Sequence, residues 1–249
     1  ITGSIAAYKS VSLASMLTKA GANVDVVMSE SATKLISPMS FHSVTGQGAY
    51  VDEDLWKRGD HVLHIHLGQV NDAFLIAPAT ANTIAKLAHG VSDNLLTVTA
   101  LASRTPLLVA PAMDGGMYAN PATQANLKRL EERGITILGP AEGHLASGLS
   151  GKGRMVEPEE LFGHLRLALG KDGPLAKRKV VVTAGGTREP LDPVRFLGNR
   201  STGKQGFALG QAALDLGANV TLIAGPTTLS TPVGAQRENV STAAAMQKA

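Results

Sequence analysis

The sequence predicts an α/β fold in which a doubly wound parallel sheet is followed by the N-terminal part of a second Rossmann-like α/β domain. Apolar runs rich in β-branched residues alternate with helical periodicities, and Gly-rich turns join them. The pattern GANV occurs at residues 21–24 and again at 217–220. Each copy marks the second strand of a strand–helix–strand unit. Repeated units of this kind predict parallel sheets with ligands at the carboxyl ends of the strands.

The elements of the first domain follow from periodicity and from turn residues. A truncated strand and the turn TGSIAAYK lead into a helix over residues 6–20, which Gly21 ends before a strand in GANVDVVMS. Further strands are expected at 72–80, 106–113 and 134–140, and helices near 80–89, 94–103 and 119–132.

The second domain is expected to follow a helix over 158–169 and the segment GKDGPLAKRK, whose Gly, Pro and charges are typical of a linker. KVVVTAGGT predicts a strand and a Gly-rich turn, and a helix and the strand ANVTLIAGP come after it. We therefore expect a first domain over 1–175, with its linker helix and linker at about 158–177, and a second over 178–249. Both ends of the sequence read as cut, which predicts an incomplete second domain.

Composition excludes several classes of protein. The 249 residues are 44% hydrophobic and 17% charged, which is far from the composition of a disordered chain. The sequence has no apolar run of the roughly 20 residues that a bilayer span needs, and no signal peptide, so a soluble, cytoplasmic protein without a membrane partner is expected. The absence of Cys excludes disulfides, thiolate metal sites and a cysteine nucleophile.

Positive charge is concentrated in one part of the chain. Residues 150–205 hold 11 Lys and Arg against 6 Asp and Glu, although the formal charge of the whole chain is only +3. This segment lacks the interleaved aromatic residues that stack on bases, and it has no recognised nucleic-acid reader motif. Phosphorylated small molecules are therefore better candidate ligands than nucleic acid.

Two turns and a histidine cluster each allow two interpretations. Gly3 and Ser4 open a helix whose first amides suit a phosphate, but the full GxGxxG fingerprint is absent and a plain turn explains them too. Ser29 is equally compatible with a ligand hydroxyl or an N-cap. His61, His64 and His66, expected in a strand, lack a third metal ligand at a recognisable spacing. An acid/base histidine is the better functional reading, and surface polarity is the alternative.

Small residues follow two expected strands. APATANT at 77–83 and APAMDGGMY at 110–118 leave room for a flat ring, whose edge Thr80 and Asn82 can hydrogen-bond, although ordinary loops can have such sequences. GNRSTGKQ at 198–205 is not a Walker A motif, because Gln205 replaces the Ser or Thr that holds magnesium. A basic, Gly-rich anion loop is the other interpretation of this segment.

Taken together, HIHL, APATANT, APAMDGGMY, ASGLSGKGRM and TAGGTREPLDPVRFLGNRSTGKQG resemble one family. This is the bifunctional phosphopantothenoylcysteine decarboxylase and phosphopantothenate–cysteine ligase family of coenzyme A biosynthesis flavoproteins. The resemblance runs in order through nearly the whole chain. It implies an FMN-dependent decarboxylase in the first domain that forms a homotrimer or higher homo-oligomer. In such an enzyme FMN oxidises the substrate thiol, CO2 is lost, and the reduced flavin converts the resulting enethiolate to phosphopantetheine.

The resemblance also implies roles for individual residues. His64, the first residue of H-I-x-L, is similar to the catalytic base. Asp114 stands where the family's carboxylate clamp has Asn, and Ser147 stands where many members have a Cys that assists reduction. An ionised Asp114 would repel a substrate carboxylate unless it is protonated, bonds elsewhere, or leaves recognition to backbone amides. The implied FMN contacts are Gly3, Ser4, Ile5, Ser29, Phe41, Pro78, Ala79, Thr80, Ala81, Asn82 and Met113, and the implied substrate contacts are Asn94, Ala112, Met117 and Lys204.

The second domain resembles the N-terminal half of the ligase, which uses CTP and Mg²⁺ to join phosphopantothenate to cysteine. Asn199 would contact the acyl intermediate, and Gly185, Gly186 and Lys204 would help to bind anionic ligands. A non-catalytic, flavin-binding regulatory subunit of the same family is the alternative, against which the intact His64 argues. A nucleotide-binding dehydrogenase would need a true GxGxxG motif, which is not evident.

Overall fold

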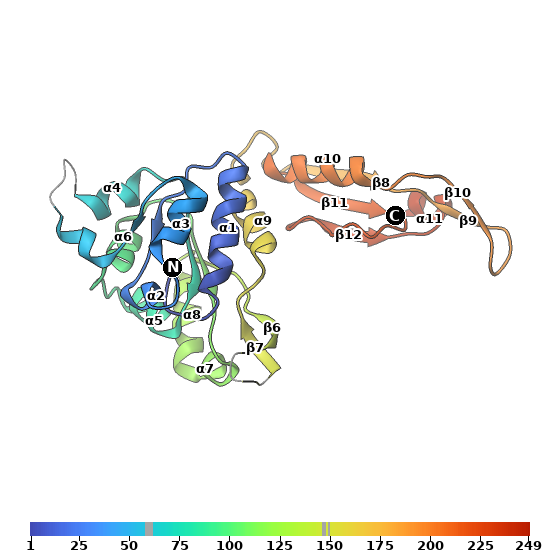
Figure 1. Cartoon of the computed structure of the whole chain (residues 1–249). Coiled ribbons are helices and arrows are strands. Elements are labelled where there is room, and N and C mark those ends of the chain that lie inside the picture. The colour runs from blue at the N-terminus through green and yellow to red at the C-terminus, as the bar shows by residue number, and fades with distance from the viewer. Residues whose placement is uncertain (58–61, 146–147, 149) are drawn as a thin grey trace. The chain divides into compact units, whose positions relative to one another are not determined.

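A computed structural model describes residues 1–57, 62–145, 148 and 150–249. Its contacts divide the chain into two units, Ile1–Phe162 and Gly163–Ala249, each with a hydrophobic core of its own. Figure 1 shows the first unit in blue to yellow and the second in orange to red. Within the described residues no helix has both the length and the apolar composition needed to cross a bilayer.

The sheet of the first unit is parallel and is completed by the first two residues of the chain. The strands are β1 (Val26–Val27), β2 (Ala49–Tyr50), β3 (Phe74–Ala79), β4 (Leu107–Pro111) and β5 (Thr136–Ile137), paired in the orders β1-β2 and β3-β4-β5. Ser29 N donates to Ile1 O at 3.0 Å, and Thr2 N donates to Pro78 O at 3.3 Å. Residues 1–2 therefore lie between β1 and β3, where the strand order reverses, which is where open α/β sheets bind ligands.

Helices cover both faces of this sheet. Val26 packs in a core with Ala14 and Phe41, which brings α1 (Ala7–Lys19) and α3 (Pro38–Thr45) to one face. Val27 packs in a second core with residues of α5 (Ala81–His89), α6 (Leu95–Ala102) and α8 (Pro121–Glu132). Because successive strand residues point to opposite faces, the two cores lie on opposite sides of the sheet. The doubly wound α/β fold predicted from the sequence is confirmed.

Shorter elements complete the first unit. They are α2 (Glu30–Thr33), η1 (Asp52–Trp56), α4 (Leu63–Gln69), α7 (Gly115–Ala119), and the antiparallel hairpin of β6 (Ala141–His144) and β7 (Ser150–Arg154). The expectation of a strand around His64 and His66 is wrong, because both residues lie in α4. Leu67 and Gly68 are buried, and a Cβ on Gly68 would lie 3.0 Å from the backbone of Ala102 in α6. Close helix packing, which no local pattern reveals, therefore fixes this segment as a helix.

The second unit has the repeated strand–helix–strand arrangement that GANV predicts. Its parallel sheet has the order β12-β11-β8, built from β8 (Lys179–Ala184), β11 (Asn219–Ala224) and β12 (Gln236–Asn239). Phe207 and Leu214 of α10 (Lys204–Asp215) pack against this sheet. The remaining elements are the antiparallel pair β9 (Arg188–Pro190) and β10 (Phe196–Gly198), and α11 (Ala243–Lys248). Helix α9 (Pro158–Gly170) spans the division between the two units.

Candidate ligand-binding site

Three loops meet at the carboxyl edge of the first sheet. The hydroxyl of Thr2 donates to Pro78 O at 2.8 Å and accepts from Thr80 N at 3.0 Å. Ala112 N donates to Ala79 O at 3.0 Å. The loops that follow residues 1–2, β3 and β4 are therefore tied together by hydrogen bonds at the point where the strand order reverses.

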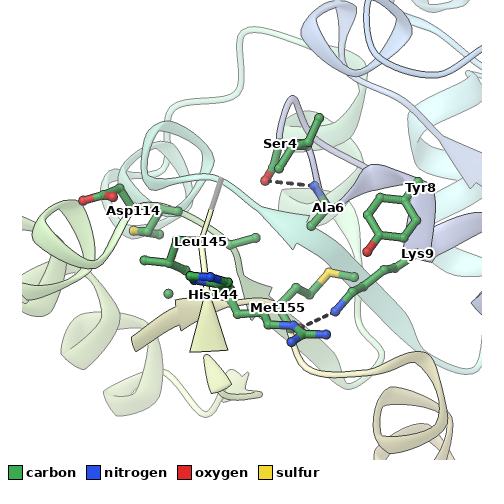
Figure 2. A pocket seen from close by; sticks show the side chains of 13 residues that line it. Ser4, Ala6, Tyr8, Lys9, Asp114, His144, Leu145 and Met155 are labelled. Carbon is green, nitrogen blue, oxygen red and sulfur yellow. Dashed lines mark hydrogen bonds between the residues drawn. The ribbon is translucent and has the colours of Figure 1, made fainter. Parts of the chain in front are cut away.

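A cavity of about 450 Å³ opens at this edge, between the first turn of α1, the loop after β4 and the β6–β7 hairpin (Figure 2). Its volume lies within the range of small-molecule sites. Five residues that the sequence assigned to FMN, to substrate or to catalysis line it: Ser4, Ile5, Ala112, Met113 and Asp114. The sequence did not predict its other lining residues: Ala6, Tyr8, Lys9, His144, Leu145, Gly153, Arg154 and Met155.

The hairpin wall of the cavity is held by close backbone contact. Met113 N donates to Gly153 O at 3.0 Å, and a Cβ on Gly153 would lie only 2.2 Å from Met113 O. Only glycine allows so close an approach of two backbones. The motif GKGRM therefore positions β7 against the loop after β4.

A buried cation joins α1 to the segment after the hairpin. Lys9 is 6% exposed, and its Nζ donates to Met155 O at 3.0 Å and to Glu157 Oε1 at 2.9 Å. Arg154 Nη2 donates to the same carboxylate oxygen at 2.6 Å. The hydrogen bond from Lys9, followed by its charge and that of Arg154, lowers the pKa of Glu157 below its ordinary value. A lysine on the buried face of α1 requires a partner for its charge, but no local pattern identifies Glu157, 148 positions away, as that partner.

Asp114 begins α7 with its carboxylate already engaged. Its Oδ1 accepts from Gly116 N at 2.8 Å, as the cap of the helix. The carboxylate of Asp114 thus bonds within the chain, which is one of the three ways in which the sequence analysis allows an Asp at this position. Met117 lies in the same short helix and is 51% exposed, outside the cavity lining.

Gly3 and Ser29 lie side by side on the sheet edge. A Cβ on Gly3 would lie 2.4 Å from Ser31 Oγ, and Ser31 Oγ is 3.0 Å from Ser29 Oγ. Ser29 is also the N-cap of α2, because its hydroxyl accepts from Ala32 N at 3.3 Å, as one of its two interpretations predicts. Ser29 does not line the cavity.

Asp52, which the sequence did not single out, links two helix starts. Its Oδ2 accepts from Glu30 N in α2 at 3.2 Å, and its Oδ1 accepts from Leu95 N in α6 at 3.0 Å. Asn94 caps α6, because its Oδ1 accepts from Thr97 N at 2.9 Å. Asp52 therefore fixes the position of Asn94 relative to the Ser29 segment.

The remaining expected FMN contacts lie around the same edge or beneath it. Thr80 caps α5 through Thr83 N at 3.3 Å, and Ala81 and Asn82 form the first turn of that helix. Pro78 and Ala79 are buried in β3. Phe41 is fully buried in the core between α1 and α3. Ser147 and His61 lie outside the described residues.

His64 lies on α4, away from the cavity lining. Its side chain is half-buried, and its Nδ1 is a buried polar atom without a hydrogen-bond partner among the described residues. Apolar residues are exposed in η1, in α6 and at the N-cap of α4, three elements that contact one another: Trp56 at 85%, Leu101 at 64% and Val62 at 60%. A single copy of the chain therefore does not bring His64 to the cavity.

Two Gly-rich loops also meet within the second unit. A Cβ on Gly186 would lie 2.4 Å from Asn199 Oδ1, and that oxygen accepts from Ser201 N at 2.9 Å. A Cβ on Gly203 would lie 3.3 Å from Gly185 N. Lys204 is the exposed first residue of α10. Asn199 and the two glycines named for anion binding thus lie together.

Comparison with known proteins agrees with these features. The chain matches the flavoprotein family over residues 1–167 and the DNA/pantothenate metabolism flavoprotein C-terminal domain over 175–249. It is 44% identical over 252 residues to the coenzyme A biosynthesis bifunctional protein CoaBC of Bacillus subtilis, covering all of this chain and 62% of that protein. The chain thus spans about three-fifths of the length of this relative.

Solved structures resemble the first unit. A PPC decarboxylase mutant complexed with pantothenoylaminoethenethiol is 40% identical with a TM-score of 0.61, and the match covers 67% of this chain and 93% of that one. The FMN binding protein AtHal3 is 39% identical with a TM-score of 0.59, and the match covers 67% and 91%. The family match over residues 1–167, together with this fold, establishes that the chain belongs to the flavoprotein family.

Proposed function

We propose that the first unit is an FMN-dependent decarboxylase that converts phosphopantothenoylcysteine to phosphopantetheine in coenzyme A biosynthesis. The observation that carries the proposal is the cavity at the carboxyl edge of the sheet, which gathers residues from TGSIAAYK, APAMDGGMY and GKGRM. The named activity of the similar PPC decarboxylase and the named ligand of AtHal3 support the same conclusion.

The residues present fit FMN. The cavity has the volume of a small-molecule site, and the side chains of Ala6 and Ala112 and the glycine at 153 leave room for a flat ring. Gly3 and Ser4 precede α1, whose positive end would hold the phosphate, and Ala112 and Met113 would contact the ring. When bound, FMN would supply the redox chemistry that the side chains of this chain cannot.

We propose that the chain self-associates, as a homotrimer or higher homo-oligomer, and that a neighbouring copy brings His64 to the cavity. The unpartnered Nδ1 of His64 and the exposed apolar residues on η1, α4 and α6 support this arrangement. In it, His64 would accept and return a proton of the substrate. Asp114 would hold the start of α7 at the cavity and leave the substrate carboxylate to backbone amides.

For the second unit we propose a part in the CTP- and Mg²⁺-dependent joining of phosphopantothenate to cysteine. The bifunctional relative and the contact of Asn199 with Gly186 support this role. Lys204, at the start of α10, would meet an anionic group of the ligand.

Titration with FMN, followed by flavin fluorescence and absorbance, tests the proposal. The parent protein is expected to bind FMN, and Ile5→Glu is expected to weaken binding by about tenfold or more, because a carboxylate at the cavity repels phosphate. Ile5 is 64% exposed, so its replacement leaves the core intact. Leu209→Glu, at a 56% exposed position of the second unit, is the matched control. A parent protein that binds no FMN would refute the proposal.

A further inference from the structure

Charged side chains that line the cavity favour an anionic ligand, in addition to the helix terminus at the sheet edge. Among the lining residues, Lys9 and Arg154 are cationic, and Asp114 is a carboxylate whose Oδ1 already caps α7. The first turn of the 13-residue helix α1 faces the same space, with the positive end of its dipole. Positive groups therefore line the cavity on two walls, Lys9 and the start of α1 on one and Arg154 of the hairpin on the other.

Lys9 and Arg154 are not equivalent in this arrangement. Lys9 is buried, and it is satisfied by the Met155 carbonyl and the Glu157 carboxylate (Figure 2 shows the first of these bonds). The side chain of Arg154 is 44% exposed, and its hydrogen bond to a described residue goes from Nη2 to Glu157. A guanidinium carries five N–H donors, so most of its donor capacity is open to a ligand.

Glu157 can lose Arg154 without becoming an unpaired charge. Its Oε1 accepts from Lys9 at 2.9 Å and from Arg154 at 2.6 Å, so two cations share one carboxylate. If Arg154 turns to a ligand, the pair of Glu157 with the buried Lys9 remains. The cost of the exchange is then the Arg154–Glu157 ion pair, in which both side chains are partly exposed, and such pairs contribute little.

We propose that Arg154 binds the phosphoryl group of a ligand in this cavity, exchanging Glu157 for phosphate, while Lys9 retains Glu157. The planar fork of arginine matches the oxygens of a phosphate in a bidentate manner. This inference rests on the proposed function, in which both the cofactor and the substrate carry a phosphate. It adds a residue from the hairpin wall that determines specificity for phosphorylated ligands.

Two pairs of compounds test the inference and identify the phosphate. Affinities for FMN and riboflavin are measured by fluorescence, and kcat/KM is measured for phosphopantothenoylcysteine and for pantothenoylcysteine, which lacks the phosphate. In one of the two pairs, Arg154→Ala is expected to lower the affinity or kcat/KM for the phosphorylated compound by about 10- to 100-fold. The same quantity for the dephosphorylated partner should stay near the parental value. Arg154→Lys, which keeps the charge but loses the fork, is expected to lie between.

Lys152→Ala is the matched control, because it removes one positive charge from the same strand at a residue outside the cavity lining. It is expected to leave unchanged the ratio of the affinities for FMN and riboflavin and the ratio of kcat/KM for the two substrates. If an active Arg154→Ala protein discriminates phosphorylated from dephosphorylated compounds as well as the parent does in both pairs, the inference is overturned and the proposed function stands. If the parent protein neither binds flavin nor decarboxylates either substrate, the proposed function is overturned, and the inference falls with it.

Discussion

At the scale of single residues, Gly153 is the position on which the cavity wall depends most directly. Its missing side chain lets β7 approach the loop that carries Met113, because a Cβ would lie 2.2 Å from Met113 O. Gly153→Ala must therefore push the hairpin away and break the bond from Met113 N to Gly153 O. A displaced wall loses van der Waals contacts with a ligand, because these contacts weaken steeply with distance. We expect FMN affinity to fall at least tenfold, measured by fluorescence titration.

Gly151→Ala is the control on the same strand, because the added Cβ would meet only Leu145 Cδ1, at 3.9 Å. This variant should bind FMN as the parent does. Equal affinities of the two alanine variants would show that the close approach at Gly153 does not position the wall.

The Lys9–Glu157 pair predicts a dependence of stability on pH. The hydrogen bond from Lys9 lowers the pKa of Glu157 from its ordinary value of 4.5. The ionised form of Glu157 is therefore more stable in the folded protein than in the unfolded chain. Its contribution is complete above pH 4.5 and is lost as pH falls through the lowered pKa of the folded protein. Glu157→Gln should therefore cost about 1–3 kcal/mol near neutral pH and progressively less in acid.

Chemical denaturation of the parent and of Glu157→Gln between neutral pH and pH 3 measures this difference. The exposed Glu159, in the first turn of α9, provides the control Glu159→Gln. A difference between parent and Glu157→Gln that grows as the pH falls would contradict the assigned sign.

At the scale of elements, α4 and the adjoining elements offer a surface that one copy of the chain leaves uncovered. Leu101 on α6 is 64% exposed and Trp56 in η1 is 85% exposed, on elements that contact one another. Burying such side chains between copies is favourable at about 25 cal/mol per Å² of apolar area, and a buried carboxylate there opposes association. We expect Leu101→Glu to shift the protein from an oligomer towards the monomer in sedimentation equilibrium.

Leu209→Glu introduces the same charge on α10 of the second unit and should leave the association of the first unit unchanged. A parent protein that sediments as a monomer while it binds FMN and turns over substrate would remove the proposed role of this surface.

Elements with local signals were predictable from the sequence. Gly21, Gly90 and Gly134 adopt the positive φ expected where helices end, and α1, α5 and α8 lie close to their predicted ranges. Helix α4 was not predictable, because burial of Leu67 and Gly68 against α6 outweighs the strand-like alternation of HIH. The strand expected in GANVDVVMS is reduced to Val26–Val27, the residues that pair with β2.

The candidate site was predictable where motifs lie at strand ends and unpredictable where distant segments meet. Ser4 and residues 112–114 follow strands whose carboxyl ends must share one edge. Lys9 and Glu157 are 148 positions apart, and no local pattern marks them as partners. Asp52 was missed for the same reason, because its two carboxylate oxygens accept from the first backbone amides of two distant helices, at Glu30 and Leu95.

At the scale of the whole molecule, the two units carry separate cores and therefore separate stabilities. One core contains Ile84 and Leu96, and the other contains Phe207 and Leu222. Scanning calorimetry should show two transitions, and FMN should raise the midpoint of only one, because a ligand at 100 times its Kd stabilises the unit that binds it by about 2.7 kcal/mol. A single transition that FMN shifts as a whole would show that the units unfold together.

The most direct test of the account is turnover by the purified chain reconstituted with FMN. Conversion of phosphopantothenoylcysteine to phosphopantetheine, followed by mass spectrometry, is expected for the parent. His64→Asn keeps a polar side chain of similar size, so it should bind FMN normally, and its rate should fall by about 100- to 10,000-fold, the usual contribution of an acid/base residue. An FMN-loaded parent that forms no phosphopantetheine would contradict the proposed reaction, and near-parental turnover by His64→Asn would contradict the role of His64.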